Sequence, residues 1–352
     1  MIRRPGVTAW LLNRSRQCAG GNAKTAIPLI TFFEKTPRRV YGVFPLVEFC
    51  GIIWKNKGGY VMAGWDDVLK ELNETMSQSD FVRRKYLRKL SEYTGRNTIA
   101  YYSSFLDKPN ASNIDINDLD MTGFMNALKG MDCNKGLDLL LHTPGGSPAA
   151  AEAIINYLRK KFNNNIRVIV PQIAMSAGTM MACAARVIIM GNQSSLGPVD
   201  PQFNGIPAYN IKMEFEEAKK DLAENPQNTQ YWAIKLQQYP AAFLKTAIDA
   251  IQLSDTLLRE WLSTCMFENE DITKVNEIVS KLNEHDDSKT HGRHFNIDFC
   301  KNIGLKIQAL EEDDRLQDAV LSVHHAYMLT LSGTDSVKII ESQNGKAVIN
   351  HL

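Results

Sequence analysis

The sequence predicts an α/β protein built on a parallel sheet, followed by a largely helical C-terminal region. Between 97 and 190, short apolar segments alternate with segments of helical period. Such apolar segments are typical of strands buried on both faces, and the alternation favours a parallel sheet with right-handed crossovers. After 205, nearly every segment has the helical period.

The pattern places the expected elements in order along the chain. Strands are expected at 97–105, 137–142, 166–170, 187–190, 305–309 and 337–341. Helices are expected at 65–94, 118–131, 147–162, 176–185, 213–225, 231–238, 241–268, 272–283, 296–303 and 314–331. Ser147 and Pro148 favour a helix start at 147, because serine caps the first turn and proline fits it. The segment 192–205 is rich in turn residues, and we expect a loop there.

The composition is that of an ordinary globular protein and excludes several functional classes. A formal net charge of +1 over 352 residues lacks the basic excess of a nucleic-acid surface. No stretch reaches the roughly 18–20 continuous apolar residues that span a bilayer. The six cysteines form neither a CxxC pair nor a Cys/His cluster. We therefore predict no metal site and a reducing, cytoplasmic compartment.

Two neighbouring strands end in turns of small residues, and these turns carry the candidate site. Ser176 lies at a strand-to-helix corner, while Gly145 and Gly146 follow the strand before it. An acyl-transfer site needs a nucleophile on one turn and backbone N–H donors for the oxyanion on another. The sequence therefore predicts Ser176 as the nucleophile and the amides of Gly145, Gly146 and Ala177 as the oxyanion hole.

Several motifs agree in order with one protein family. They are HTPGG (142–146), MSAGT (175–179), SSLGPVDPQ (194–202), THGRHF (290–295), NIGL (302–305) and SVKIIE (336–341). From 62 to the C-terminus the chain resembles the serine dehydrogenase proteinase family, which is related to the signal peptide peptidase A family. The resemblance implies a Clp/crotonase-like ββα superhelix and a serine endopeptidase that forms an acyl-enzyme on Ser176.

The resemblance leaves the general base open. Clp proteases use a Ser-His-Asp triad. The matching motifs put Asp200 at the position of the Clp histidine and His291 near the position of the Clp aspartate, so the two residue types are exchanged. Triads are defined by geometry and not by order, so His291 as base and Asp200 as its orienting partner is one hypothesis. His294 in the same loop is a second candidate. Signal peptide peptidases use a lysine instead, for which Lys235 has the most apolar surroundings.

The domain organisation follows from these observations. We predict a weakly ordered extension at 1–61, a helical segment at 62–96 and the peptidase domain at 97–352. The extension is rich in Lys and Arg and has no sustained period, and Met62 opens a segment typical of a protein start. A start-site error or a targeting peptide therefore stays an alternative for 1–61.

Two other functional classes compete with the peptidase. A crotonase-type acyl-CoA enzyme shares the fold and normally uses carboxylates, so Asp200 keeps this class open. A non-catalytic assembly module is the other class.

The sequence contains no GxxxxGK[ST] motif and no GxGxxG motif after a strand, so we expect no cofactor. The expected partners are a peptide or protein substrate and further copies of the chain, through the apolar face of 241–268, for which membrane attachment stays open.

Overall fold

The computed structural model describes residues 79–283 and 290–352. The predicted extension at 1–61 and the first part of the predicted helical segment, 62–78, lie outside these residues. Helix α2 (Ser79–Thr94) opens the described chain and agrees with the end of the expected helix. Among the described residues, no helix is both long enough and apolar enough to cross a membrane.

A seven-stranded sheet in the order β11-β10-β1-β2-β3-β5-β9 forms the centre of the fold. Its strands are β1 (Asn97–Ser103), β2 (Leu137–His142), β3 (Ile166–Val170), β5 (Val187–Met190), β9 (Ile307–Ala309), β10 (Ser336–Ser342) and β11 (Ala347–His351). The five strands from β1 to β9 pair in parallel, which confirms the predicted α/β fold with a parallel sheet. β10 is antiparallel to both β1 and β11, and β11 was not expected.

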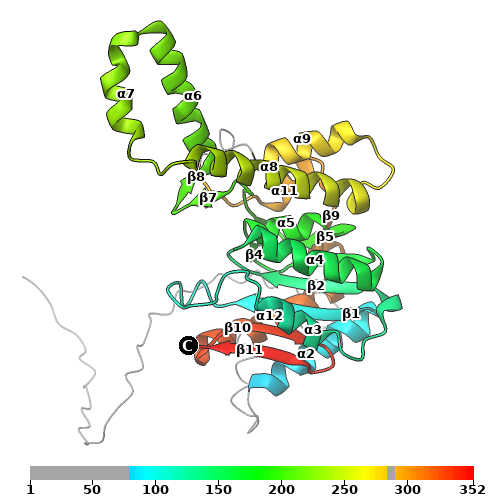
Figure 1. The fold of residues 1–352 in the computed structure, drawn as a ribbon. Coiled ribbons are helices and arrows are strands. Elements are labelled where there is room, and N and C mark those ends of the chain that lie inside the picture. Colours follow the sequence, from blue (N-terminus) through cyan, green and yellow to red (C-terminus); the bar gives the residue numbers. More distant parts are fainter. Residues whose placement is uncertain (1–78, 284–289) are drawn as a thin grey trace, which may run out of the picture. The chain divides into compact units, whose positions relative to one another are not determined.

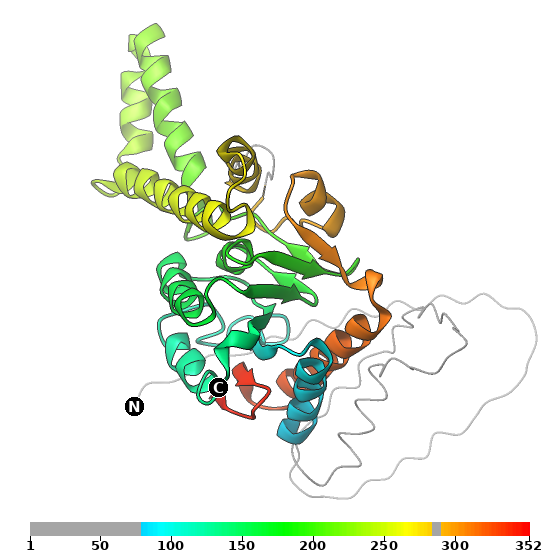
Figure 2. The same cartoon turned by 90° about the vertical axis from the view of Figure 1, so that its right-hand side faces the viewer.

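Helices cover both faces of this sheet (Figures 1 and 2). On one face lie α2 and α12 (Asp314–Gly333); on the other lie α3 (Asp120–Ala127), α4 (Pro148–Phe162) and α5 (Ala177–Cys183). Neighbouring strand residues divide between the two cores: Tyr101 packs in the larger core with α3, α4 and α5, and Tyr102 in the core with α2 and α12. This alternation follows from the period of two in a strand.

The start of α4 shows how local sequence sets an element next to the site. Ser147 caps the helix, accepting a hydrogen bond from the Ala150 N–H at 3.2 Å, and Pro148 occupies its first position. The helix ends at Asn163, which takes the left-handed conformation that favours asparagine and glycine. The predicted helix start is therefore confirmed, and α4 begins directly after the Gly145–Gly146 turn.

The C-terminal half is mostly helical, as expected, with several differences in its bounds. Its elements are α6 (Ala208–Glu224), α7 (Thr229–Leu236), α8 (Phe243–Trp261), a π-helical turn (Leu262–Met266), α9 (Ile272–Asn283), α11 (Ile297–Asn302) and 3₁₀ turns at Pro226–Asn228 and Leu310–Glu312. A further 3₁₀ turn, Cys133–Lys135, precedes β2. The helix expected at 241–268 is thus shorter, because the α-helical hydrogen bonding changes to a π-turn after Trp261.

The loop expected at 192–205 is partly wrong, because it contains strand residues. β6 (Ser195–Leu196) pairs in parallel with β4 (Ile173–Ala174), and β7 (Gln202–Phe203) pairs with β8 (Ile206–Pro207). Two-residue strands have no readable period, so only their partners define them. β4 is followed by Met175 and Ser176 and then by the next helix, so the β4–β6 pairing fixes where this strand-to-helix turn begins.

Candidate functional site

Ser176 lies at a strained corner between β4 and α5. Its backbone angles are φ 51° and ψ −118°, a region that residues with a side chain rarely adopt. Such strain costs about 1–3 kcal/mol and persists only where the surrounding structure imposes it. A serine on a sharp strand-to-helix turn is the geometry of a nucleophile elbow, which exposes the hydroxyl above the sheet. Ser176 is half-buried, and its hydroxyl makes no hydrogen bond within the described residues.

The Gly145–Gly146 turn packs directly against this corner. Both glycines have positive φ, 103° and 147°. A Cβ atom on Gly145 would lie 2.7 Å from the Ser176 Cβ and 2.8 Å from the Met175 carbonyl oxygen. A Cβ atom on Gly146 would overlap the backbone of Ile116. The turn is therefore held between the Ser176 corner and the Ile116 segment at a spacing that only glycine allows.

Backbone hydrogen bonds bring the two turns together. Thr143 continues β2 and pairs with Ala174 of β4, donating its N–H to the Ile173 carbonyl at 3.1 Å. On its other side the glycine turn pairs with Ile116, whose N–H donates to the Gly145 carbonyl at 2.7 Å. Because groups alternate in extended chain, the Gly146 N–H is directed away from Ile116.

The predicted oxyanion donors differ in their present partners. The Gly145 N–H donates to Thr143 Oγ1 at 3.2 Å, so an oxyanion would have to share or replace that bond. The N–H groups of Gly146 and Ala177 donate to no group within the described chain. Two backbone donors next to the Ser176 corner are thus available for an incoming charge.

His291 and Asp200, which the sequence motifs selected, contact one another. His291 Nδ1 lies 2.8 Å from Asp200 Oδ1, and Gln202 Nε2 donates to Asp200 Oδ2 at 2.8 Å. Asp200 is 2% exposed, whereas His291 is partly open to solvent. With a carboxylate as partner, Nδ1 carries the proton and Nε2 is left as an acceptor. Sequence reasoning missed Gln202, although it closes the SSLGPVDPQ motif.

The strand register brings this pair to the same end as Ser176. Ala174 of β4 lies opposite Leu196 of β6, and Leu196 in turn bridges to Phe295 in an antiparallel manner. Asp200 lies four residues after Leu196, and His291 lies four residues before Phe295, so the antiparallel direction of the two segments leads to both of them. Ser176 lies two residues after Ala174. No hydrogen bond joins Ser176 to His291 among the described residues, and such bonds are often long in substrate-free sites.

The other candidate bases have different partners. His294 Nδ1 lies 2.7 Å from Ser195 Oγ, so this ring joins the loop to β6 and does not contact Asp200. Lys235 lies on α7, where it forms an ion pair with Glu214 of α6 at 2.7 Å and covers the Trp232 ring. The hydrogen bond to Glu214 raises the pKa of Lys235, whereas a lysine base needs a lowered pKa. The structure does not bring Lys235 to Ser176.

His142 precedes the glycine turn and is fully buried. Neither ring nitrogen finds a hydrogen-bond partner in the part of the chain that the structure describes, and the ring packs against Phe105, Tyr102 and His324. Burial lowers the pKa of His142 to about 3 and also lowers the pKa of His324. Both rings therefore stay neutral in the folded chain, and His142 is a packing residue behind the site.

These two histidines predict a loss of stability in acid. Because their pKa values are lower in the folded than in the unfolded chain, the unfolded chain binds more protons below pH 6.5. We expect the free energy of unfolding to fall as the pH drops from 6.5 towards 3, by up to about 1.4 kcal/mol per pH unit for each ring. Urea unfolding at pH 7, 6 and 5 would measure the slope. His142→Phe should flatten it, and an unchanged slope in this variant would contradict the assignment.

The described residues contain no grouping of His, Cys, Asp and Glu that could hold a metal ion.

Comparison with known proteins gives a family match over most of the chain. Residues 69–312 match the model of a family described as ClpP-like SDH-type serine proteinases, which agrees with the resemblance of the motifs and with the predicted Clp-like fold. An uncharacterized protein of Methanocaldococcus jannaschii is 42% identical over 106 residues, 30% of this chain and 37% of that protein. A second one is 45% identical over 75 residues, 21% of this chain and 25% of its own length.

The chain thus spans about a third and a quarter of the two curated relatives. Among solved structures, a serine-to-alanine mutant of the 1510-N membrane-bound stomatin-specific protease matches 57% of this chain and 78% of its own chain. That match has 18% identity and a TM-score of 0.33.

Proposed function

Since the chain belongs to the family of ClpP-like SDH-type serine proteinases, we propose that it is a serine endopeptidase with Ser176 as its nucleophile. The observation that carries this proposal is the strained Ser176 corner packed against Gly145. A corner of this geometry has a cost in stability that tight packing alone does not require. A catalytic role explains this cost, because the corner keeps the Ser176 hydroxyl without a hydrogen bond in the described chain and next to backbone N–H donors.

In the proposed mechanism, His291 is the general base. Ser176 Oγ attacks the carbonyl carbon of the peptide bond while His291 Nε2 takes the hydroxyl proton. Asp200 accepts the Nδ1–H bond, which fixes the tautomer and stabilises the imidazolium that forms. His291 then gives the proton to the leaving amine, and an acyl-enzyme remains on Ser176. Water, activated by the same histidine, hydrolyses this ester and restores the serine.

The backbone of the two turns would stabilise the oxyanion. We assign the donors to the N–H of Ala177 and to those of the glycine turn, Gly145 and Gly146. Ala177 begins α5, so the positive end of the helix adds to its N–H, although α5 is short. Loss of one such donor typically costs about 3–4 kcal/mol of transition-state stabilisation.

No observation favours the competing enzyme class. An acyl-CoA reaction of the crotonase type would need a carboxylate free to exchange protons with its substrate. Both carboxylate oxygens of Asp200 accept hydrogen bonds, from His291 and Gln202, and the residue is 2% exposed. Such a carboxylate suits the orientation of a histidine better than proton transfer to a substrate.

Labelling by a fluorophosphonate tests the proposal. We expect the wild type to be labelled at Ser176, because the probe reacts with an activated serine hydroxyl. His291→Ala should lower the labelling rate by about 10²–10⁴-fold, the typical contribution of a general base. Lys235→Ala is the matched control and should label at the wild-type rate. Absence of labelling in folded wild type would contradict the peptidase, and loss of labelling in Lys235→Ala alone would replace His291 by the lysine.

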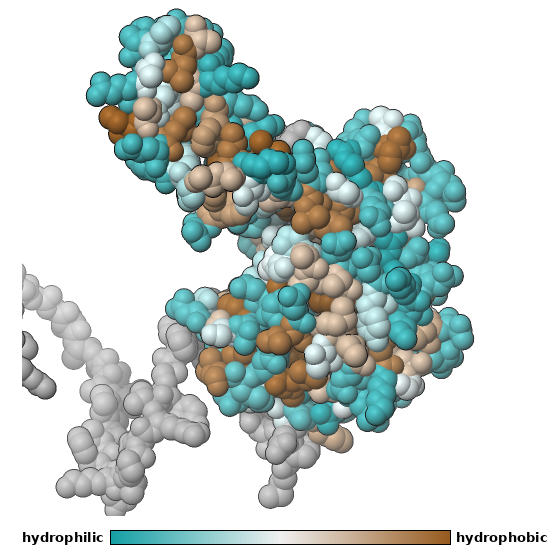
Figure 3. Space-filling model, in the orientation of Figure 1, coloured by the Kyte–Doolittle hydropathy of each residue, from teal (hydrophilic) through white to brown (hydrophobic). Residues whose placement is uncertain are grey.

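Assembly into a homo-oligomer is part of the proposal. Apolar side chains of the α6–α8 region remain exposed, and Figure 3 shows apolar surface over these helices. They are Ile206, Met213, Tyr231, Ile234 and Leu253. The apolar face of 241–268, through which further copies were expected to bind, packs instead within the chain, where Ala247, Leu257, Leu258, Trp261 and Leu262 are buried. Clustered exposed apolar residues are typical of protein interfaces. Light scattering that gives only the 39.6 kDa monomer would contradict assembly.

A further inference from the structure

We propose that the buried ion pair between Asp120 and Lys338 positions the glycine turn for catalysis; this inference rests on the proposed serine peptidase function. Neither residue contacts the reacting groups. Both act through the Asp115–Asn117 segment, the backbone of which holds Gly145 and Ser147 from the side opposite Ser176.

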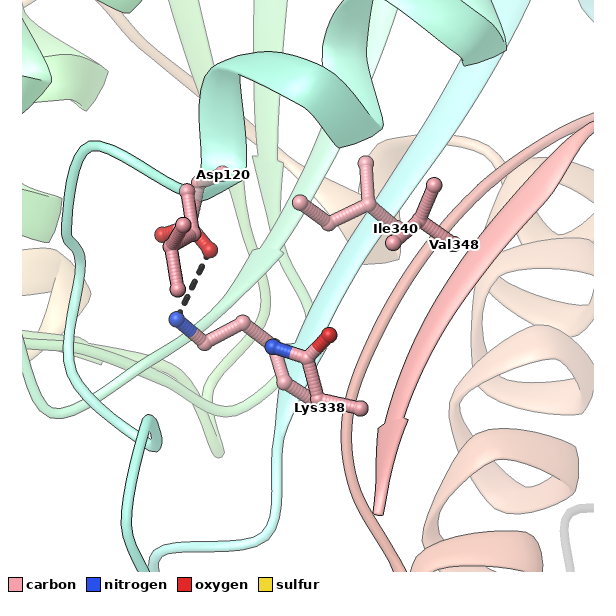
Figure 4. Close-up of a pocket in the computed structure, with 6 residues that line it drawn as sticks. Asp120, Lys338, Ile340 and Val348 are labelled. Carbon is pink, nitrogen blue, oxygen red and sulfur yellow. Dashed lines mark hydrogen bonds and ion pairs between the residues drawn. The ribbon is translucent and has the colours of Figure 1, made fainter.

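The pair is buried between α3 and β10. Lys338 Nζ lies 2.8 Å from Asp120 Oδ1, and each side chain is 1% exposed (Figure 4). Tyr101 donates its hydroxyl to Asp120 Oδ2 at 2.7 Å, which fixes the carboxylate further. Removing two charges from water has a large desolvation cost, so both groups need hydrogen bonds as well as one another. They obtain part of these bonds from the backbone that lies between them and the candidate site.

That chain is the segment Asp115–Asn117. Lys338 Nζ donates to the Asp115 carbonyl at 2.6 Å. Asp120 Oδ2 accepts the Asn117 N–H at 3.0 Å. The backbone is therefore held on both sides of Ile116. The ammonium of Lys338 binds the carbonyl before Ile116, and the carboxylate of Asp120 binds the N–H after it.

Ile116 passes this constraint to the glycine turn. Its N–H donates to the Gly145 carbonyl at 2.7 Å, and its own carbonyl accepts the Ser147 N–H at 2.9 Å. Gly146 lies so close that a Cβ atom would overlap the Ile116 backbone. A shift of the Ile116 segment would therefore move the glycine turn, and with it the donors beside Ser176. Misplacement of about 1 Å in a catalytic group can lower a rate by roughly 10²-fold.

A second buried ion pair on the same strand provides a matched control. Glu341 of β10 pairs with Arg83 of α2 at 3.1 Å, and both side chains are 0% exposed. Glu341 also accepts the Tyr327 hydroxyl at 2.9 Å. This pair lies with the core of α2 and α12, on the sheet face opposite Asp120. It has comparable burial but contacts no part of the segment that holds the glycine turn.

The test compares two double variants by the kinetics of fluorophosphonate labelling. Asp120→Asn/Lys338→Met removes both charges of the proposed pair and the bond to the Asp115 carbonyl. Arg83→Met/Glu341→Gln removes both charges of the control pair and leaves the bonds to the Asp115–Asn117 segment in place. We expect the first variant to lower the maximal labelling rate at saturating probe by about 10- to 100-fold, with the probe concentration at half-maximal rate changed by less than about twofold. The control variant should keep both constants within about twofold of wild type.

The outcomes separate the proposals. Wild type that is folded but unlabelled would overturn the serine peptidase and this inference with it. Labelled wild type with wild-type rates in Asp120→Asn/Lys338→Met would overturn the inference alone. Equal rate losses in both double variants would also overturn it, since general loosening would then explain them. If the first double variant does not fold, Asp120→Asn alone keeps a hydrogen-bonding side chain and should still lower the maximal rate selectively.

Discussion

Ser176→Gly is expected to be inactive and yet more stable than the wild type. Ser176 is held at φ 51° and ψ −118°, which costs about 1–3 kcal/mol for a residue with a side chain. Glycine adopts such angles freely but gains roughly 0.5–1 kcal/mol of conformational freedom in the unfolded chain. The net expected gain in the free energy of unfolding is therefore about 1 kcal/mol, measured by urea unfolding.

Ser176→Ala separates the hydroxyl from the strain. Alanine keeps the Cβ atom and the strained backbone, so its stability should stay within about 0.5 kcal/mol of wild type. Both variants should lose hydrolysis by a factor of about 10⁴–10⁶, as removal of a catalytic serine does. A drop of several kcal/mol in Ser176→Ala would mark the serine as a packing residue.

Ala242→Gly serves as the control for backbone strain. Ala242 is exposed and also has positive φ, 64°, but its ψ of 4° places it in the ordinary left-handed region. That region is less costly than the Ser176 conformation. The variant should therefore show a smaller stability gain and full activity. A larger gain in stability at Ala242 than at Ser176 would contradict the greater backbone strain assigned to the Ser176 corner.

The sequence predicted the local parts of the site because they depend on local rules. A serine between an apolar strand and a helix of small residues, and a glycine pair at the end of the strand before it, are each readable within a few residues. The parallel order of β2 and β3 then follows from their crossover helix. The structure adds the angles, the pairing of Thr143 with Ala174 and the closeness of Gly145 to Ser176.

The His291–Asp200 contact could be predicted only through the family resemblance. Its geometry depends on the bridge between Leu196 and Phe295, residues that are far apart in the sequence. β6 has only two residues and therefore no period, and the segment was expected to be a loop. Tertiary pairing decided its conformation over local turn propensity.

The strand β11 has a local sequence signal that our prediction did not use, and the ion pair between Asp120 and Lys338 has none. Asn344-Gly345 between two apolar segments is a strong hairpin signal, and it joins β10 to the unpredicted β11. The partnership of Asp120 with Lys338 had no local sign, because α3 and β10 come from opposite ends of the described chain. An ion pair of this kind is visible only once the sheet order places β10 beside β1.

Gly145→Ala is expected to abolish activity and to destabilise the fold. The added methyl group would lie 2.7 Å from the Ser176 Cβ and 2.8 Å from the Met175 carbonyl oxygen, so the two turns must move apart. Overpacking costs about 1–3 kcal/mol, and a φ of 103° adds about 1–2 kcal/mol for alanine. We expect a loss of about 2–5 kcal/mol in the free energy of unfolding and at least a 10²–10³-fold loss of labelling rate, because the proposed oxyanion donors are displaced.

Gly95→Ala distinguishes displacement of the site from backbone strain. Gly95 follows α2 with φ 66°, and a Cβ atom there would meet no atom within 4 Å. Alanine at this position suffers the cost of positive φ without a collision, about 1 kcal/mol, and should leave the labelling rate unchanged. If the two variants lost stability and labelling to the same extent, strain alone would explain both. A selective loss of labelling in Gly145→Ala would instead mean that catalysis depends on the spacing between the glycine turn and Ser176.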